Sequence, residues 1–295
     1  MNLVVTITYN AFSSGILEPF FACLRAQTAS DFAVLVIDNA SSDGTREFLE
    51  ELRLPNLEVV FNDENIGFAR ACNQAIELAQ QRNADCITFL NNDTEFDPEL
   101  IGAIGASLRD SGADILSPRI PFFDHPERIW FERGSFPWSR GLVARHDGIG
   151  LPAARTGEGR YRATAFVPGC CLIADMRVFE RIPGLDERYF VYWEDADLCK
   201  ALSARGARIV TDTQLECLHK VSISTGGAFS DFSVFHFNRG HMIFVRKHYG
   251  FPALAWALSF SIAKAIFNAA RGKMALRQLP IWFRGIRSGL RERLG

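Results

Sequence analysis

An aspartate that follows a run of apolar residues is well placed to hold a metal ion. Residues 85–90 are mostly apolar and predict a buried strand, after which come Asn91, Asn92 and Asp93. Mg²⁺ and Mn²⁺ take oxygen ligands, and they bind through one or two carboxylates together with substrate phosphates. We therefore predict that Asp93 holds a divalent cation against a diphosphate. The alternative is that Asp93 only caps a turn.

Three further carboxylates, Glu194, Asp195 and Asp197, open a predicted helix over residues 193–205. Successive residues of a helix diverge by about 100°, so the three cannot all face one substrate. A helix N-terminus favours the ionised form of a carboxylate, which a general base requires. Alternatively, the three acids only complement the helix dipole, and we consider this reading plausible for Asp197.

A polar cluster at residues 38–45 follows another apolar run. Asp38 at the end of a strand can accept a hydrogen bond from a pyrimidine ring N–H or from a ribose hydroxyl. Asp43 is a natural cap for the next helix. Taken alone, the cluster could be no more than a polar loop.

The first 120 residues contain the elements that must position these groups. Buried strands that alternate with helices predict a mostly parallel, doubly wound α/β sheet, in which ligands bind at the carboxyl ends of the strands. We expect strands at 3–8, 32–37, 57–61 and 85–90 and helices at 14–27, 43–52 and 66–81. The polar groups directly after these strands are Tyr9-Asn10, Asp38-Asn39 and Asn91-Asn92-Asp93.

The second half of the chain is less regular. Residues 122–160 are rich in Pro, Gly and aromatic residues, and we expect a long loop that could act as a flap over the site. A strand pattern returns at 164–173 around Pro168 and Gly169, and a late strand is expected at 207–211.

Five motifs together resemble those of glycosyltransferase family 2, in the same order and spacing. The similarity is closest to the rhamnosyltransferase-like bacterial branch and covers roughly residues 1–250. The motifs are Thr8-Tyr9-Asn10, residues 38–45, Asn65-Ile66-Gly67-Phe68-Ala69, Asn91-x-Asp93 and Trp193-Glu194-Asp195-x-Asp197.

This resemblance implies a GT-A type fold with a helical C-terminal tail. The catalytic domain would cover residues 1–238, with a nucleotide-binding half at about 1–120 and an acceptor half at about 121–238, and the tail would cover 239–295. The implied enzyme is an inverting, metal-dependent glycosyltransferase that uses a nucleotide diphosphate sugar. Our first expectation is rhamnose from dTDP-rhamnose, transferred to a glycan or lipid-linked glycan hydroxyl in bacterial surface polysaccharide synthesis.

The resemblance also implies roles for individual residues. Asp195 would be the catalytic base beside Glu194, and Asp93 would bind Mg²⁺ or Mn²⁺ with His219, which follows the last strand. Asn91 stands where the family more often has an aspartate, so one negative charge is missing from the metal site. Gly169 and Trp193 would lie on the acceptor side. The implied nucleotide-sugar-binding residues are Thr8, Tyr9, Asn10, Asp38, Asn65, Gly67, Arg70, Asn91 and Asn92.

Other classes of protein fit the sequence less well. A sugar nucleotidyltransferase needs a Gly-rich loop with Arg or Lys after the first strand, and a nicotinamide dehydrogenase needs G-x-G-x-x-G there. The sequence has Tyr9-Asn10-Ala11-Phe12 at that place. A catalytically inactive sugar-nucleotide or glycan-binding module remains an alternative, although Glu194 and Asp195 argue against it.

Composition indicates a globular protein, because hydrophobic residues make up 48% of the chain and charged residues 22%. The seven cysteines show no metal-binding spacing, so we expect buried free thiols in a reducing cytoplasm. The N-terminus has no basic region before its apolar run, and we expect no secretion signal. No nucleic-acid partner is expected.

The net charge of −2 conceals a basic tail, since residues 239–295 carry 11 Lys or Arg and one acid. Lys264, Asn268 and Arg271 recur at helical spacing, opposite apolar residues that include Ile262 and Ile266. An apolar stripe backed by basic residues predicts a helix on the inner face of the cytoplasmic membrane. Only 13 residues, 251–263, are free of charge, fewer than the roughly 20 that span a bilayer. The alternative is that the tail packs on the catalytic domain or on a dimer partner.

Overall fold

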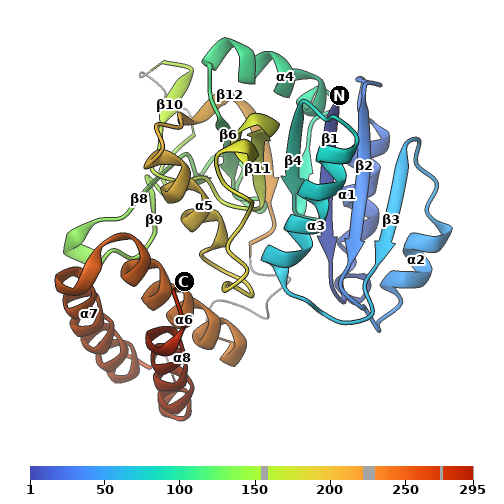
Figure 1. The fold of residues 1–295 in the computed structure, drawn as a ribbon. Coiled ribbons are helices and arrows are strands. Elements are labelled where there is room, and N and C mark those ends of the chain that lie inside the picture. Colours follow the sequence, from blue (N-terminus) through green and yellow to red (C-terminus); the bar gives the residue numbers. More distant parts are fainter. Residues whose placement is uncertain (154–158, 222–229, 273–274, 295) are drawn as a thin grey trace.

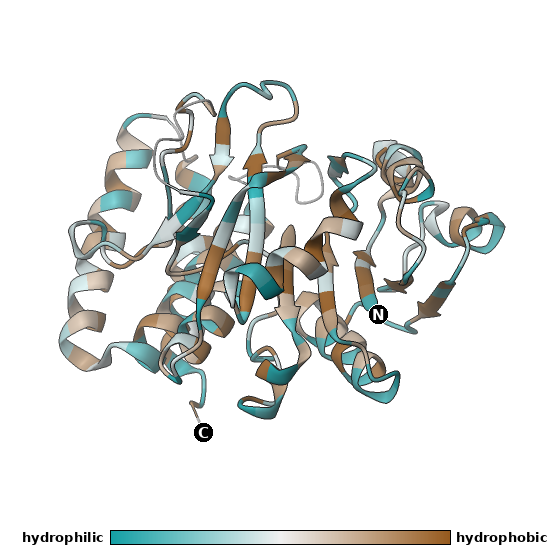
Figure 2. Ribbon diagram, turned by 90° about the horizontal axis from the view of Figure 1, so that it is seen from above, coloured by the Kyte–Doolittle hydropathy of each residue, from teal (hydrophilic) through white to brown (hydrophobic). Residues whose placement is uncertain are grey.

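A computed structural model describes residues 1–153, 159–221, 230–272 and 275–294. It contains a mostly parallel sheet with helices on both faces and three helices at the C-terminus (Figure 1). The expected fold class, including the helical C-terminal tail, is confirmed. In Figure 2 the strands in the middle of the molecule contain hydrophobic stretches, as expected for a sheet that is covered on both faces.

The first half of the sheet is parallel. Strand β1 (Asn2–Thr8) lies between β2 (Phe32–Asp38) and β4 (Cys86–Leu90), and β3 (Leu57–Phe61) pairs with β2. Parallel strands end at the same edge of a sheet, so the polar residues after β1, β2 and β4 gather at one rim.

The second half of the sheet mixes strand directions. Strand β11 (Cys171–Asp175) runs antiparallel to both β4 and β6 (Ile115–Pro121), whereas β12 (Ile209–His219) runs parallel to β6. The edge strand β10 (Tyr161–Ala163) pairs with β12, and so does β5 (Thr94–Phe96), at the far end of that strand. The β5 pairing brings the end of β12 beside the polar segment that follows β4.

Helices cover this sheet and bury its apolar side chains. The helices of the first 203 residues are α1 (Leu17–Arg25), α2 (Thr45–Glu51), α3 (Phe68–Gln81), α4 (Leu100–Ser111) and α5 (Glu194–Ser203). Short 3-10 helices are η1 (Phe12–Ser14), η2 (Trp138–Arg140), η3 (Met176–Glu180) and η4 (Leu276–Gln278).

The region 122–160 was expected to be one long loop, and this prediction was wrong. It contains β7 (Ile129–Phe131), a hairpin of β8 (Arg133–Ser135) with β9 (Arg145–Asp147), and η2. Strands of three residues are too short to leave a periodic pattern in the sequence. Residues 154–158 of this region lie outside the described part of the chain.

Two smaller expectations also need correction. Of the strand expected at 164–173, only residues 171–173 are in a strand, as the start of β11; residues 164–170 connect β10 to β11 and include a turn at Gly169. The N-cap residue of α2 is Gly44 in a left-handed conformation, not Asp43, although the Asp43 side chain accepts from the N–H of Thr45, the first residue of the helix, at 3.2 Å. Asp43 also accepts hydrogen bonds from the Ser13 N–H at 2.9 Å and from the Thr45 hydroxyl at 2.6 Å.

The C-terminal region consists of α6 (Asp231–His248), α7 (Gly250–Ala270) and α8 (Leu279–Arg291). The division expected at residue 239 falls inside α6. Helices α6 and α8 approach closely at Gly285, where a Cβ atom would lie 2.6 Å from the carbonyl oxygen of Phe235. Only a residue without a side chain permits this distance.

Ion pairs join α6 to α5. Lys247 Nζ donates to Asp197 at 2.6 Å and to Asp186 at 2.7 Å, and His248 Nε2 lies 2.7 Å from the other oxygen of Asp197. The Asp197 side chain is only 3% exposed. The C-terminal helices are therefore anchored to the helix that carries the candidate catalytic residues.

We predict that Gly285→Ala lowers stability by about 1–3 kcal/mol, because the added methyl group forces α8 away from α6. Thermal unfolding followed by circular dichroism measures this change. Gly105→Ala in α4 is the matched control, since its Cβ would meet only the guanidinium end of Arg109 at 3.4 Å. The control should keep or raise stability, because alanine is the better helix former. Equal melting temperatures for both variants would contradict the proposed close packing.

Candidate active site

A cavity of about 570 Å³ lies where the polar ends of the strands meet α5 and the C-terminal helices. It is lined by residues of the central strands, of the 122–160 region and of α5 to α8. The residues predicted from the sequence that the structure brings together here are Asn91, Asp93, Gly169, Trp193, Glu194, Asp195 and His219. The predicted catalytic, metal-binding and acceptor-side residues thus share one cavity.

Asp195 is held at the start of α5 by two backbone groups. The Gly169 N–H donates to Oδ2 at 2.8 Å and the Ala196 N–H donates to Oδ1 at 2.6 Å. Burial raises the pKa of Asp195, although these N–H groups oppose the shift. The helix start was expected to favour the ionised form. In the structure desolvation outweighs that effect.

Glu194 is buried beside Asp195, with 5% of its surface exposed. Its Oε2 has no hydrogen-bond partner among the described residues. Burial, and then the charge of Asp195, raise the pKa of Glu194 well above its usual value. Because two adjacent buried carboxylates repel each other, the pair favours a neutral Glu194 beside an ionised Asp195.

Asp197 points away from this cavity. It accepts a hydrogen bond from the Tyr189 hydroxyl at 3.1 Å in addition to its contacts with Lys247 and His248. The three acids therefore do not face one substrate, as the geometry of a helix predicts.

Trp193 connects the start of α5 to α6. It has a left-handed φ of 79°, its indole N–H donates to the carbonyl of Phe237 at 2.9 Å, and its ring stacks on His241 with 5.0 Å between centroids. Gly240 makes room for this ring, because a Cβ there would lie 2.6 Å from Trp193 Cδ1. The indole is thus fixed as one wall of the cavity.

The pairing of β5 with β12 brings Asp93 and His219 together. His219 Nε2 lies 3.4 Å from Asp93 Oδ1, and both side chains are buried. His219 is the last residue of β12, whereas we expected it to follow the strand. The Trp130 ring packs edge-on against His219 at 4.4 Å and equally against His146, in which burial lowers the pKa to about 4.

The Asp93–His219 pair suits a divalent cation. His219 Nδ1 is buried and has no hydrogen-bond partner in the described residues, and a carboxylate and an imidazole are both ligands for Mn²⁺. Within the described ranges, no group of three or more His, Cys, Asp or Glu side chains forms a complete metal site. A metal at Asp93 would therefore need oxygen ligands from a substrate diphosphate and from water.

Asp38 lies at the end of β2 and is 1% exposed. One oxygen accepts from the hydroxyls of Thr8 at 2.7 Å and Ser41 at 2.6 Å, and the other from the Ser41 N–H at 2.9 Å. A carboxylate has about four acceptor positions, so about one is left for a ligand. Thr8 is completely buried and serves to orient Asp38.

The other predicted nucleotide-binding residues shape the neighbouring loops. Asn10 has a left-handed φ of 49° and accepts from the Ser42 N–H at 2.8 Å, while Tyr9 beside it is 51% exposed. Asn65 accepts from the N–H of Gly67 at 3.0 Å. Gly67 has a positive φ and packs against Phe190, which leaves no room for a side chain.

Arg70 and Asn92 complete this group. The Arg70 guanidinium lies 3.2 Å from Glu187 and remains partly exposed, whereas Asn92 is buried and donates to the carbonyl of Ile7 at 3.0 Å. Of the predicted nucleotide-binding residues, only Asn91 lines the cavity that contains Asp195. The others lie at the ends of β1, β2 and β4 or at the start of α3, where a nucleotide could extend away from the reacting atoms.

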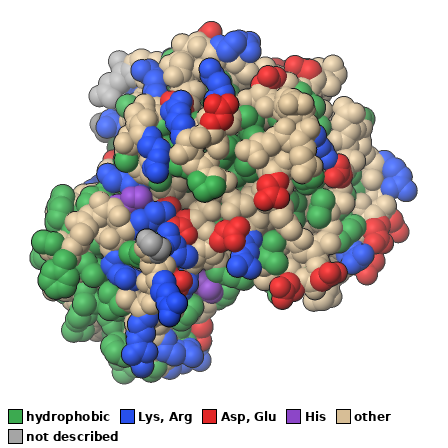
Figure 3. Space-filling model, viewed as in Figure 1, with side chains coloured by type: hydrophobic (Ala, Val, Ile, Leu, Met, Phe, Trp, Pro, Cys, Tyr) green, Lys and Arg blue, Asp and Glu red, His purple; other side chains and the backbone are tan. Residues whose placement is uncertain are grey.

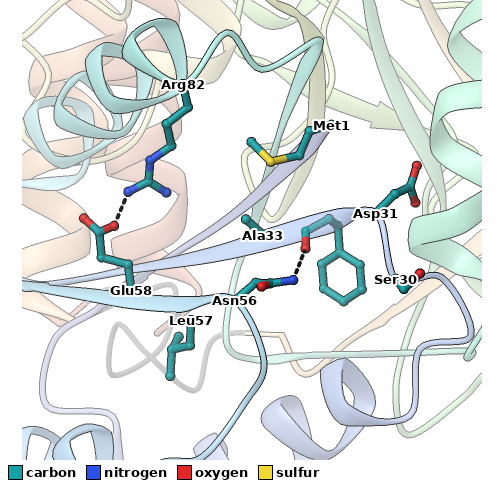
Figure 4. Close-up of a pocket in the computed structure, with 9 residues that line it drawn as sticks. Met1, Ser30, Asp31, Ala33, Asn56, Leu57, Glu58 and Arg82 are labelled. Atoms are coloured by element: carbon teal, nitrogen blue, oxygen red, sulfur yellow. Dashed lines mark hydrogen bonds and ion pairs between the residues drawn. The ribbon is translucent and has the colours of Figure 1, made fainter.

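A second hollow lies at the opposite edge of the sheet, near Met1 and Ala33 (Figure 4). Two of its charged side chains are already paired, since Arg82 contacts Glu58. It lies at the amino ends of β1 to β3, far along the strands from the polar residues described above. We therefore do not regard it as a catalytic site.

Sequence reasoning missed several residues of the cavity wall. Trp130 and His146 come from the region that had been expected to be a loop, and His241 comes from α6. No local pattern marked them. Lys264 and Asn268 were recognised as a polar pair at helical spacing, but the sequence could not show that both line the cavity.

Comparison with known proteins agrees with this geometry. The family model described as glycosyl transferase family 2 matches residues 3–182. An N-acetylglucosaminyl-diphospho-decaprenol L-rhamnosyltransferase of Mycobacterium tuberculosis is 29% identical over 288 residues, which covers 88% of this chain and 90% of that protein.

Solved structures share the fold at lower identity. Staphylococcus aureus TarS 1-349 in complex with UDP-GlcNAc has a TM-score of 0.63 and 16% identity, over 98% of this chain and 80% of that one. The mannosyltransferase PcManGT of Pyrobaculum calidifontis, in complex with GDP-Man and Mn²⁺, has a TM-score of 0.57 and 16% identity, over 98% and 85%. The match to more than half of the chain shows that this protein belongs to glycosyl transferase family 2.

Proposed function

We propose that this glycosyltransferase is an inverting, metal-dependent enzyme that transfers rhamnose from dTDP-rhamnose to a lipid-linked glycan in surface polysaccharide synthesis. The observation that carries the proposal is that Asp195 and the Asp93–His219 pair line one cavity. The printed activity of the mycobacterial relative supports both the sugar and the lipid-linked acceptor.

The proposed reaction is a single displacement. Asp195 takes the proton from an acceptor hydroxyl as that oxygen forms a bond to the anomeric carbon of the donor sugar. The bond from the anomeric carbon to the diphosphate oxygen breaks, and the nucleotide diphosphate leaves with the bonding electrons. Attack from the face opposite the leaving group inverts the configuration. The Gly169 N–H keeps Asp195 oriented for this step.

Asp93 and His219 would hold the cation on the donor side of the cavity. A bound Mg²⁺ or Mn²⁺ would supply positive charge that stabilises the departing diphosphate. The solved structures that share this fold and contain GDP-Man and Mn²⁺, or UDP, GalNAc and Mn²⁺, support a divalent ion.

Asp195→Asn should lower the rate of transfer at least roughly 10²-fold while leaving donor affinity unchanged, because the amide cannot accept the proton. Transfer from dTDP-rhamnose to a sugar diphosphate polyprenol measures the rate, and calorimetry measures donor binding. Near-normal transfer by this variant would overturn the assignment of the base.

The activity of the unmodified enzyme should depend on pH through the same group. A base must be deprotonated, and burial raises the pKa of Asp195, so activity should fall as pH falls and should begin to fall at a higher pH than for an exposed aspartate. A pH profile of kcat/KM measures this fall of activity on the acidic side. If kcat/KM does not fall at acidic pH while the protein stays folded, another group is the base.

Asp93→Ala should weaken binding of a nucleotide diphosphate in Mn²⁺ but much less in EDTA, because only the metal-dependent part of the affinity is lost. Isothermal titration calorimetry under both conditions gives the comparison. His219→Ala should also weaken the binding of the nucleotide diphosphate in Mn²⁺, by a smaller factor. An equal loss with and without metal would assign Asp93 a role other than metal binding.

We also propose that the protein lies on the inner face of the cytoplasmic membrane through α7. In the described part of the chain, α7 is the one helix with the length and composition of a membrane span, and 22% of its most apolar window is buried. Lys264 and Asn268 of α7 line the cavity, and Ala253 and Ala257 are buried. These contacts favour a helix lying along the membrane surface over one that crosses it.

Hydrophobic side chains gather on the face where α7 lies, at the lower left of Figure 3, with Lys and Arg side chains over neighbouring α8. Large apolar side chains of α7 that are exposed are Phe251, Trp256, Ile262, Ile266 and Phe267. An apolar surface beside basic residues is what an anionic lipid surface would attract.

Ile266→Asp should lower binding to anionic vesicles roughly tenfold or more, because the burial of one isoleucine side chain in lipid is lost. Co-sedimentation with phosphatidylglycerol vesicles measures the fraction of protein that is bound to the lipid. Ile149→Asp is the matched control, since Ile149 is 50% exposed and lies outside the C-terminal helices. Equal binding by the unmodified protein and both variants would show that α7 does not contact the lipid.

A further inference from the structure

Helix α7 faces two environments. Ala253, Ala257 and Ala265 are buried against the rest of the protein, whereas Phe251 and Ile266 are more than half exposed. Between these two faces, Lys264 and Asn268 line the cavity that contains Asp195. One helix thus joins the cavity to an exposed apolar surface.

Lys264 brings an uncompensated positive charge to that wall. Its ammonium has no carboxylate within 4.0 Å among the residues that the structure describes. Desolvation, and then the charge of Arg140, lower the pKa of Lys264. An anion bound beside the ammonium would offset both the desolvation of Lys264 and its repulsion by Arg140.

Lys264 is close to the residues that form the catalytic wall. Its charge is one of the causes that depress the pKa of His241, after burial, and that pKa is about 4. The neutral His241 stacks on Trp193, which is the residue directly before Glu194 and Asp195. His241 also contacts the carbonyl of Gly141 at 2.9 Å, so it is fixed between α5 and the loop that holds α7.

The position of α7 is fixed by contacts with the same loop. The indole N–H of Trp256 donates to the carbonyl of Trp138 at 2.7 Å, and the Phe260 ring fills the space in front of Gly141, where a Cβ would lie 2.7 Å from it. Lys264 lies one turn beyond Phe260 on the same helix. The backbone that carries Lys264 is therefore fixed beside the cavity, and the exposed Lys264 side chain lies at the rim of that cavity.

We propose that Lys264 binds the diphosphate of the lipid-linked acceptor, with Asn268 as a second hydrogen-bond donor and with the lipid chain leaving along the apolar face of α7. This inference rests on the proposed function, because it identifies how that acceptor is held. The acceptor has three parts that match three neighbouring surfaces: a sugar hydroxyl at Asp195, a diphosphate at Lys264 and a hydrocarbon chain at the exposed face. The donor diphosphate would lie on the other side, at Asp93 and His219.

Binding of geranyl diphosphate in EDTA tests the site without catalysis and without metal at Asp93. The unmodified protein should bind it, Lys264→Gln should lose roughly tenfold or more in affinity, and Lys264→Arg should keep most of it, since a charge-assisted hydrogen bond is restored. Arg271→Gln is the matched control, because Arg271 carries the same charge at the end of the same helix but does not line the cavity. Equal losses in Lys264→Gln and Arg271→Gln would indicate general electrostatics and overturn the proposal.

Kinetics separates this proposal from the proposed function. Two acceptors are compared: a sugar diphosphate linked to a short polyprenol, and the same sugar as an alkyl glycoside without phosphates. Lys264→Gln should raise KM roughly tenfold or more for the first acceptor and leave KM for the second unchanged. If the unmodified enzyme uses both acceptors and the variant changes neither KM, the Lys264 site is wrong while the proposed function stands. If the unmodified enzyme transfers to neither, the proposed function itself fails.

Discussion

The buried carboxylate of Asp197 fixes the C-terminal helices to the helix that carries the proposed catalytic residues. It accepts from Lys247 and contacts His248 on α6, while α5, on which it lies, begins at Glu194, directly before Asp195. A buried charge must be paired, and removal of one partner of such a pair is strongly destabilising. This constraint makes α6 a wall of the active site, and through α6 it also positions α7 and α8.

The cavity combines groups of different charge. Glu194 favours its neutral form because burial and Asp195 raise its pKa, and burial keeps His146 and His241 neutral at physiological pH. Of the two adjacent carboxylates at the start of α5, Asp195 is thus the one that can accept a proton. Because the groups around the remaining charges are buried and uncharged, the local dielectric constant is low. The electrostatic interactions of those charges are therefore stronger than in water. This arrangement suits a reaction in which a proton leaves one oxygen and negative charge develops on a diphosphate.

Helix α7 relates this chemistry to the surface of the molecule. Small residues on one face, such as Ala257 and Ala265, let it pack on the domain, and the opposite face keeps large apolar side chains exposed. A water-soluble acceptor would not require such a surface next to the cavity. A lipid-linked acceptor would, since its sugar must reach Asp195 while its hydrocarbon chain stays out of water.

The sequence by itself determined the parallel half of the sheet, because apolar runs and helical spacing depend only on neighbouring residues. It also indicated the polar ends of those strands, since a topological rule places ligands there. Tertiary structure decided the rest. The contact of Asp93 with His219 depends on the pairing of β5 with β12, between residues more than a hundred positions apart. The ionisation of Glu194 depends on burial, and the face that Lys264 presents depends on how α7 packs, neither of which a local pattern records.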